Sequence, residues 1–156
     1  MFTYRDSTRE DFARIADFPA SASEAFYMFP RGSFPMDSQH LYEVSLTRKA
    51  PTVIEYNKEP VGYSTLYDVE EGSGWLGNVI ISKHHRRIGA ARYLIETMVN
   101  RAKEQFGVRE LHLVCHNTNT KALLLYHQIG FKPYDLRIVT NEEKVEIAGV
   151  VMKLTL

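Results

Sequence analysis

An amphipathic stretch from Arg87 to Phe106 constrains the fold of this chain more than any other feature. Its apolar residues recur at intervals of three and four, which predicts one long helix with a buried face, and Gly107 supplies the stop. Apolar runs at 75–82 and 110–115 flank the stretch and predict strands. Strand, helix and strand in this order form a crossover unit, so the two strands should be parallel neighbours with the helix packed on one face of their sheet.

The remaining elements place this unit in a mixed, mainly antiparallel α/β fold. Further strands are expected at 2–5, 52–56, 61–67, 131–139 and 145–154, and further helices at 6–18, 21–28, 37–46 and 119–129. A chain of 156 residues with 44% hydrophobic and 24% charged residues is typical of a globular protein rather than a disordered one. We therefore expect a single domain over residues 1–156.

Positive charge is concentrated in the segment that contains the long helix. The chain is neutral, with 19 basic and 19 acidic residues, but residues 83–109 hold seven basic and two acidic side chains, a net charge of +5. The rest of the chain carries −5, so an anionic ligand would be attracted to this segment. A solvated helix face explains the same charges equally well, so charge alone assigns no function.

Several other classes of protein are disfavoured. No stretch approaches the ~18 apolar residues of a membrane-spanning helix, and the opening residues lack the apolar run of a secretion signal. The lone Cys115 cannot form an internal disulfide, and His112 and His116 share a strand face without a third metal ligand. We therefore expect a cytoplasmic protein with no metal site and no membrane partner. Overall neutrality and the lack of aromatic residues among the basic ones argue against nucleic-acid binding.

The turn between the strand at 75–82 and the long helix has the composition of an anion-binding corner. A helix start leaves backbone N–H groups unpaired, and these can bind a phosphate. Gly89 and the small residues Ala90 and Ala91 permit close approach of a ligand, while Arg86 and Arg87 add positive charge. A glycine that only eases a tight turn is the alternative.

Two motifs resemble the GNAT N-acetyltransferase superfamily. Arg86-Arg-Ile-Gly-Ala-Ala is similar to its Arg/Gln-x-x-Gly-x-Gly/Ala signature, which also lies between a strand and a helix. Asn119-Thr-Lys-Ala-Leu-Leu-Leu-Tyr126, followed by Gly130-Phe131, is similar to the family's Asn-x-x-Ala-x-x-Leu-Tyr helix and its step into the next strand. The motifs cover roughly residues 75 to 132, and the expected order of elements resembles the family over nearly the whole chain.

The resemblance implies a six- to seven-stranded GNAT-like sheet flanked by helices, with a parallel strand pair that splays apart at the cofactor site. It also implies acetyl-CoA as the acyl donor, with its pyrophosphate on the corner amides and its pantetheine arm along the preceding strand. A backbone N–H near the end of that strand would polarise the acetyl carbonyl. The residues that the resemblance assigns to cofactor binding are Val79, Ile80, Ile81, Arg86, Arg87, Ile88, Gly89, Ala90, Ala91 and Asn119. For Asn119, a simple helix cap is the favoured alternative.

Tyr126 is the candidate general acid. Acetyl transfer from a thioester releases a thiolate that needs a proton, and a phenol with an ordinary pKa near 10 can supply it. Tyr126 also falls on the packing stripe of its helix, so a purely structural role in the core is the alternative. The family motif places a tyrosine at this spacing near the sulfur, which favours the catalytic role.

No residue stands out as the general base that the acceptor amine requires. Many relatives carry a Glu at the start of the strand before the signature, where this chain has Trp75. Asn78 is a second catalytic candidate because its amide can orient a water or the acceptor, with a structural amide as the alternative. Glu70, Glu71 and His112 stay open, although they are more typical of a solvated turn and of a core histidine.

These residues together predict an acetyl-CoA-dependent N-acetyltransferase that acts by direct attack of a primary amine in a ternary complex. Cys115 is a poor covalent carrier because no paired histidine signature accompanies it. By the resemblance, the aromatic residues Phe26, Tyr27, Phe29 and Phe34 around a Pro-Gly loop line the pocket for a small-molecule or peptide amine. Ordinary core packing of these rings is the alternative. A non-catalytic CoA- or acyl-CoA-binding sensor is the alternative function. The oligomeric state is open, and a homodimer is compatible with the sequence.

Overall fold

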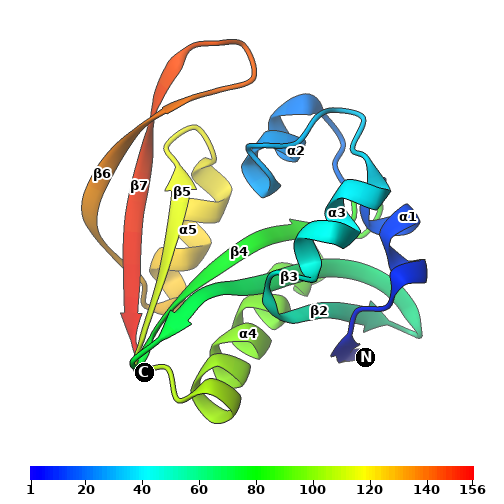
Figure 1. Ribbon diagram of the computed structural model, residues 1–156, viewed down its shortest axis with the longest axis horizontal. Coiled ribbons are helices and arrows are strands. Elements are labelled where there is room, and N and C mark those ends of the chain that lie inside the picture. Colours follow the sequence, from blue (N-terminus) through cyan, green and yellow to red (C-terminus); the bar gives the residue numbers. More distant parts are fainter.

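The computed structural model describes all residues from Met1 to Leu156 and contains one seven-stranded sheet. The strands lie in the order β1-β2-β3-β4-β5-β7-β6, and only β4 and β5 are parallel neighbours (Figure 1). The strands are β1 (Phe2–Asp6), β2 (Lys49–Tyr56), β3 (Glu59–Glu70), β4 (Ser73–Ile81), β5 (Glu110–His116), β6 (Lys132–Thr140) and β7 (Glu146–Thr155).

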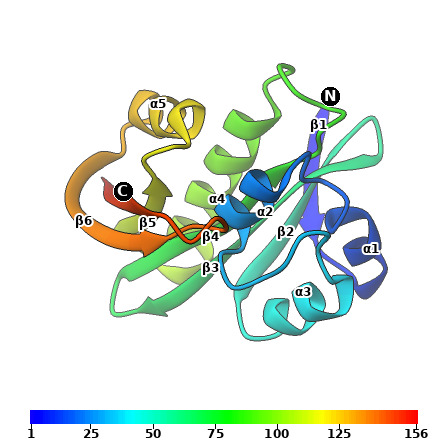
Figure 2. The same cartoon turned by 90° about the horizontal axis from the view of Figure 1, so that it is seen from above.

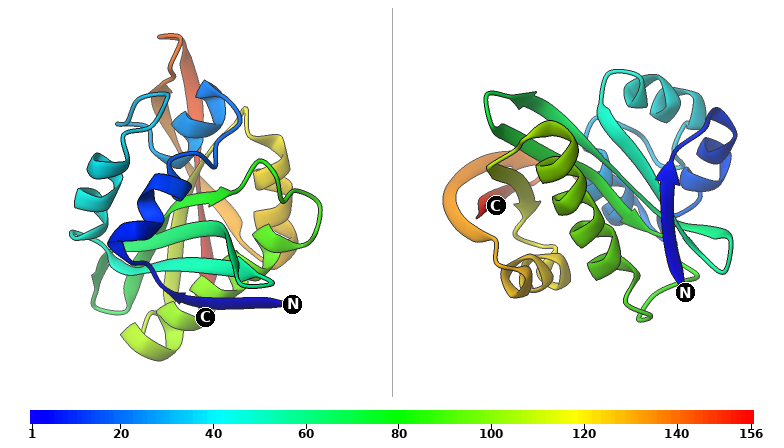
Figure 3. Two further views of the ribbon diagram at one scale, coloured as in Figure 1. Left: turned by 90° about the vertical axis from the view of Figure 1, so that its right-hand side faces the viewer. Right: turned by 90° about the horizontal axis from the view of Figure 1, so that it is seen from below.

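Helices cover both faces of this sheet. The helices α4 and α5 pack on one face, and α1, α2 and α3 lie over the other, as the views from above and below show (Figures 2 and 3). None of them has the length and apolar character that crossing a membrane requires. The helical segments are η1 (Arg9–Asp11), α1 (Phe12–Ile15), α2 (Ala22–Met28), α3 (Ser38–Ser45), α4 (Ala90–Phe106) and α5 (Thr120–Ile129).

The expected crossover unit of β4, α4 and β5 is confirmed. α4 ends at Gly107, which adopts a left-handed φ of 64°. It begins at Ala90 rather than at Arg87 as predicted, because Arg87 and Gly89 have left-handed φ values of 62° and 85° that no α-helix tolerates. The centre of the apolar stripe of α4 is fully buried against the sheet, for example at Leu94 and Met98, while Val99 and Phe106 at its margins are partly buried.

The predicted helix over 6–18 is wrong except at its centre. Asp6 belongs to β1, where it pairs with Thr52, and only the short segments η1 and α1 are helical. The segment then turns away from the helix path, because the carbonyl of Phe18 accepts a hydrogen bond from the amide of Lys83. Pro19, directly after it, cannot donate a helical hydrogen bond.

Strand alternation divides the buried residues into two cores. In β2, Val53 packs under α1 and α3, while the next residue, Ile54, packs under α4. Both side chains are fully buried. Each such aliphatic side chain stabilises the fold by about 1.5–3 kcal/mol, so both layers of helices are held on the sheet by apolar burial.

The parallel pair splays apart, as expected. β4 and β5 are paired only from Ser73–Glu110 to Trp75–His112. Beyond that point β4 stays paired with β3 as far as Ile81, and β5 stays paired with β7 as far as His116. The two strands therefore diverge from a common end (Figure 1), and the edge of β4 from residue 76 onward has no strand partner on this side.

Candidate functional site

A small cavity of about 60 Å³ lies where β4 and β5 diverge. Its lining includes Asn78 and Val79 from β4, Cys115 and His116 from β5, and Tyr126 from α5. A space of this size admits a group of only a few heavy atoms. The opened strand pair thus surrounds a compact site with polar side chains from three elements.

Tyr126 lies between the apolar core and this cavity. Its side chain is 7% exposed, and its ring packs edge-on against Phe131 at a centroid distance of 5.6 Å. Its hydroxyl makes no hydrogen bond to another residue. Burial, and to a lesser degree the neighbouring thiol of Cys115, raises the pKa of Tyr126 well above its ordinary value. The phenol therefore stays protonated at neutral pH and can act as a proton donor.

Asn78 forms a bulge in β4. Its φ is 55°, and the pairing of β4 with β3 shifts register at this residue. Its Nδ2 donates to the carbonyl of Met28 in α2 at 3.0 Å, and its Oδ1 accepts from Thr65 Oγ1 at 2.9 Å. The Asn78 amide therefore ties the opened strand to α2 and β3, which leaves one N–H of the side chain for any contact with a ligand.

The corner before α4 is open and presents unpaired amides. The backbone N–H groups from Arg86 to Arg92 donate to no carbonyl within the chain. A Cβ added to Gly89 would meet no atom within 4 Å, so no side chain occludes the corner. Arg87, Ile88 and Gly89 are all exposed, and Ala90 is buried at the first position of the helix. Unpaired amides at the start of a long helix suit a phosphate group.

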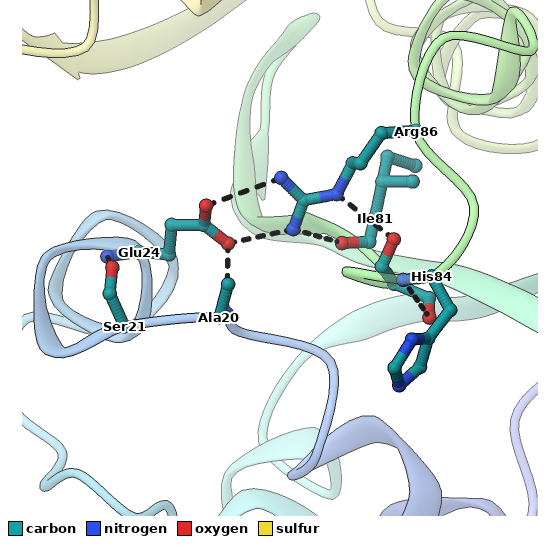
Figure 4. Close-up of polar contacts among 7 residues, drawn as sticks. Ala20, Ser21, Glu24, Ile81, His84 and Arg86 are labelled. Atoms are coloured by element: carbon teal, nitrogen blue, oxygen red, sulfur yellow. Dashed lines mark hydrogen bonds and ion pairs between the residues drawn. The ribbon is translucent and has the colours of Figure 1, made fainter.

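Arg86 is held by the protein itself (Figure 4). Its two terminal nitrogens donate to the Glu24 carboxylate at 2.7 and 3.2 Å. Its Nη2 and Nε also donate to the carbonyls of Ile81 and Ser82, both at 2.9 Å. Arg86 thereby joins α2 to the end of β4. The Ile81 carbonyl that it binds belongs to the segment that is expected to contact the pantetheine arm.

The carboxylate of Glu24 is fixed as firmly as its partner. Besides Arg86, it accepts the backbone N–H of Ala20 at 3.0 Å (Figure 4). Burial opposes ionisation of this group, but the hydrogen bonds from Arg86 and Ala20 outweigh it and lower the pKa of Glu24. Arg87, by contrast, forms no ion pair and remains free to meet an anion.

A second, larger cavity of about 670 Å³ lies between α2, the loop after it and the turn that joins β6 to β7. Phe26, Phe29 and Phe34 line it from one side, and the turn contributes Glu142 and Glu143. The tip of the β6–β7 hairpin leans over α2 (Figures 1 and 3), and Ser23 Oγ donates to Glu142 Oε1 at 2.8 Å. The cavity is therefore both aromatic and acidic.

Tyr27, expected in the aromatic pocket, faces the small cavity instead. Its hydroxyl is hydrogen-bonded to Thr118 Oγ1 at 2.8 Å. Asn119 takes the expected position at the start of α5, but its side chain makes no capping hydrogen bond and lines the small cavity. The expectation of a capping side chain is therefore wrong, and Asn119 is left facing the same space as Tyr126.

The three open candidates for the base lie away from the cavity. Glu70 is the last residue of β3 and Glu71 lies in the turn before β4, and neither side chain lines the cavity. His112 stacks on Trp75 at 4.8 Å and is hydrogen-bonded to the hydroxyl of Tyr134 at 2.8 Å. No cluster of three or more His, Cys, Asp or Glu side chains has the arrangement of a metal site.

From the sequence, His116 is considered only as a potential metal ligand, and its position at the cavity is not predicted. Its side chain is 5% exposed and packs against Phe26 and Tyr27, with ring centroids 4.7 and 5.8 Å away. Burial lowers the pKa of His116, and the charge of Glu142 opposes this shift. The available signal was its place at the end of a buried strand, three residues before the motif that begins at Asn119.

Comparison with known proteins agrees with this geometry. Residues 12–131 match the model of the Acetyltransferase (GNAT) family. A probable spermine N(1)-acetyltransferase from Bacillus subtilis subsp. natto is 24% identical over 149 residues, which cover 90% of this chain and 93% of that protein. An uncharacterized N-acetyltransferase, YobR, from Bacillus subtilis strain 168 is 32% identical over 78 residues, which are 50% of this chain but only 31% of that protein.

Solved structures share the fold over the whole chain. Spermidine N-acetyltransferase from Vibrio cholerae, in complex with CoA and spermine, has a TM-score of 0.83 at 20% identity, covering 99% of this chain and 95% of that one. A putative acetyltransferase from Salmonella typhimurium with its cofactor acetyl-CoA has a TM-score of 0.76 at 18% identity, covering 100% and 94%. The family and the fold class predicted from the sequence are therefore confirmed.

Proposed function

The chain belongs to the GNAT family of N-acetyltransferases, whose acyl donor is acetyl-CoA, and on this premise we propose that it acetylates a small cationic primary amine by direct attack in a ternary complex. Tyr126 acts as the general acid. One observation carries the proposal: the buried side chain of Tyr126 lines the cavity between the diverging strands, and its accessible hydroxyl bonds to no other residue.

The residues around the gap fit the parts of acetyl-CoA. The open corner amides, from Arg87 to Ala91, receive the pyrophosphate, and the free side chain of Arg87 adds a charge-assisted contact. The unpaired edge of β4 supplies backbone groups for the pantetheine arm. When bound, acetyl-CoA supplies a thioester carbonyl, which a backbone N–H near Val79 or Ile80 polarises.

Tyr126 completes the transfer by giving its proton to the departing thiolate. Its raised pKa ensures that the proton is present over the whole neutral range. The small volume of the cavity leaves room for few water molecules beside the thioester, so the phenol competes with few other donors. Cys115 is disfavoured as a covalent carrier, because burial raises the pKa of its thiol to about 12 and leaves almost no thiolate.

The larger cavity indicates the kind of acceptor. Its phenylalanine rings suit the apolar chain of an amine, and Glu142 and Glu143 suit a positive charge. A relative with almost full coverage is a probable spermine acetyltransferase, and a structural neighbour is a spermidine acetyltransferase. An aliphatic di- or polyamine therefore fits this chain better than a neutral or anionic acceptor.

A thiol-release assay tests the proposal. The protein is incubated with acetyl-CoA and, one at a time, spermine, spermidine, 1,4-diaminobutane, lysine, glutamate and a peptide with an N-terminal alanine, and the acetylated product is identified by mass spectrometry. We expect the fastest turnover with the aliphatic polyamines. Binding of CoA without turnover of any amine would instead identify a CoA-binding sensor.

A further inference from the structure

Two buried polar side chains that face the small cavity have no partner in the protein. Tyr126 and His116 are 7% and 5% exposed, and neither the phenol nor the imidazole is hydrogen-bonded to another residue. The one fully buried side-chain nitrogen or oxygen without a partner is His85 Nδ1, so the polar atoms of Tyr126 and His116 are accessible rather than sealed in the core. Both groups are therefore available to hydrogen-bond a ligand in this cavity.

The two side chains reach the cavity from opposite faces of the sheet. Side chains alternate along β5, so Cys115 points into the core beneath α5, which contains Tyr126, while His116 points toward α2. In a fully paired sheet the strands themselves would separate the two groups. The divergence of β4 and β5 removes this barrier, and both residues line the same space.

His116 also lies at the boundary between the two cavities. Its ring packs on Phe26, whose side chain lines the larger, acidic cavity, and it lines the smaller one itself. The cavity proposed to bind the amine therefore adjoins the small cavity at His116. We propose that His116 is the general base that takes a proton from the ammonium group of the acceptor, an inference that rests on the proposed function.

The proton balance of the reaction assigns a role to each side chain. His116 accepts one proton from the ammonium group and passes it to solvent, which leaves a neutral amine. The nitrogen lone pair then forms the C–N bond, the C–S bond breaks, and its electron pair leaves with sulfur. Tyr126 protonates this thiolate and regains a proton from the nitrogen. Ammonium and thioester become amide, thiol and one released proton.

The surroundings keep His116 in the form that a base requires. The titratable groups around it are Tyr27 from α2, Cys115 on its own strand, Tyr126 from α5 and Glu142 from the β6–β7 turn. Burial lowers the pKa of His116 more than the charge of Glu142 raises it. The imidazole is thus neutral at pH 7 and able to accept a proton.

Substitution of His116 tests the inference in the full-length protein. We expect His116→Ala and His116→Gln to lower kcat with spermine, or with the amine of the panel that turns over fastest, by roughly 100-fold or more. CoA affinity, measured by calorimetry, should stay within a factor of two or so. Added imidazole should restore part of the activity of His116→Ala. We expect the wild-type rate to fall at low pH as His116 is protonated, and this fall should be absent in both variants.

Three controls separate this role from a structural one. His112→Ala removes the other histidine of β5, which is partly exposed and lies outside the cavity. This variant should leave kcat unchanged. A more acidic ammonium, such as 2,2,2-trifluoroethylammonium in place of ethylammonium, should reduce the effect of His116→Gln because less base catalysis is needed. Thermal unfolding monitors folding of each variant.

The outcomes distinguish the inference from the proposed function. If the wild-type protein turns over an amine but His116→Gln retains its kcat and its pH profile, the assignment of His116 is wrong and the function stands. A reduced kcat without imidazole rescue and with an unchanged pH profile also overturns it, because only packing was then lost. Absence of turnover by the wild-type protein overturns both.

Discussion

Two regions of the molecule bury polar side chains in opposite ways. At one side of the sheet, Arg101 of α4 is 9% exposed, and its guanidinium donates to Thr52 Oγ1 at 2.7 Å, to Asp6 Oδ1 at 2.8 Å and to Gln105 Oε1 at 3.1 Å. At the gap between β4 and β5, Tyr126 and His116 are similarly buried side chains, but their polar atoms are accessible from the cavity and bond to no other residue. The polar groups of the first region are paired within the protein, whereas those of the second are available to a ligand.

This contrast separates stability from activity. A satisfied buried group contributes to the free energy of unfolding, and its removal leaves its partners unpaired. An unsatisfied one contributes little to folding beyond its apolar area, so its removal should affect the reaction instead. Substitutions in the two regions should therefore move different measurements.

The largest expected effect is that of Tyr126→Phe. The variant keeps the ring that packs on Phe131 and loses only a hydroxyl that bonds to nothing in the protein, so the melting temperature should change little. Loss of the proton donor should lower kcat about 10²- to 10³-fold while CoA affinity is retained. Steady-state kinetics, calorimetry and thermal unfolding measure the three quantities. An unchanged kcat would return Tyr126 to a purely structural role.

Arg101→Met should show the reverse pattern. It preserves much of the buried aliphatic length but leaves the Thr52 hydroxyl without its charged partner, which should lower the free energy of unfolding by about 2 kcal/mol. Activity per folded molecule should be unchanged. Urea denaturation measures the loss. The matched control is Lys103→Met, at an exposed position on the same helix, and its free energy of unfolding should lie within about 0.5 kcal/mol of wild type. A fall in kcat of the folded variant would contradict the view that Arg101 contributes to stability and not to the reaction.

Gly89→Ala tests whether the corner before α4 binds the phosphate groups of CoA. A left-handed φ costs a residue with a Cβ roughly 1–2 kcal/mol, although the added atom would meet no neighbour. Because the strain falls on the proposed phosphate-binding amides, the Kd for CoA should rise roughly tenfold. Gly107→Ala, at the other end of α4, has the same left-handed backbone and the same open space. It should cost similar stability with no change in this Kd, and equal effects of both variants on Kd would rule out the corner as the phosphate site.

The smallest expected effect concerns the partly exposed pair of Glu24 and Arg86. Glu24→Gln should lower the free energy of unfolding at pH 7 by up to about 1 kcal/mol. The folded-state pKa of Glu24 is lowered, so this stabilisation is fully present above the ordinary glutamate pKa of about 4.3 and is lost as the pH falls through the folded-state value. The free energies of unfolding of wild type and variant, measured by urea titration at a series of pH values, should become equal at acidic pH. A constant difference at all pH values would assign the effect to packing rather than to charge.

Most of the fold could be predicted because its signals are local. The periodicity of the α4 stretch and the alternating strands around it depend on residues a few positions apart, and these elements are present in the structure. The helix predicted over 6–18 failed where distant residues decide the outcome, since pairing with Thr52 places Asp6 in a strand. The start of α4 was misplaced because the left-handed backbone of Arg87 has no signal in its side chain.

The candidate site divides in the same way. The glycine corner and the position of Tyr126 follow from motifs that are contiguous in the chain, and the structure places them at the corner and at the cavity. The partners of Arg86 do not follow, because Glu24 lies 62 residues away and meets it only once α2 packs beside β4. His116 is the clearest case, since its one signal in the sequence, a place at the end of a buried strand just before the Asn119 motif, is equally typical of a packing histidine.

The amino-acid sequence by itself determined the crossover unit, the helix start with its unpaired amides, and a tyrosine at a fixed spacing from an asparagine, because each depends on backbone geometry within one element. The tertiary structure alone decided which buried polar groups find partners. Arg101 forms hydrogen bonds with Thr52 and Asp6, while Tyr126 and His116 pack against aromatic rings and form no hydrogen bond to another residue at the cavity. Hydrogen bonding between distant segments is a property of their packing, and it is this packing that separates the groups that hold the fold from those available to a substrate.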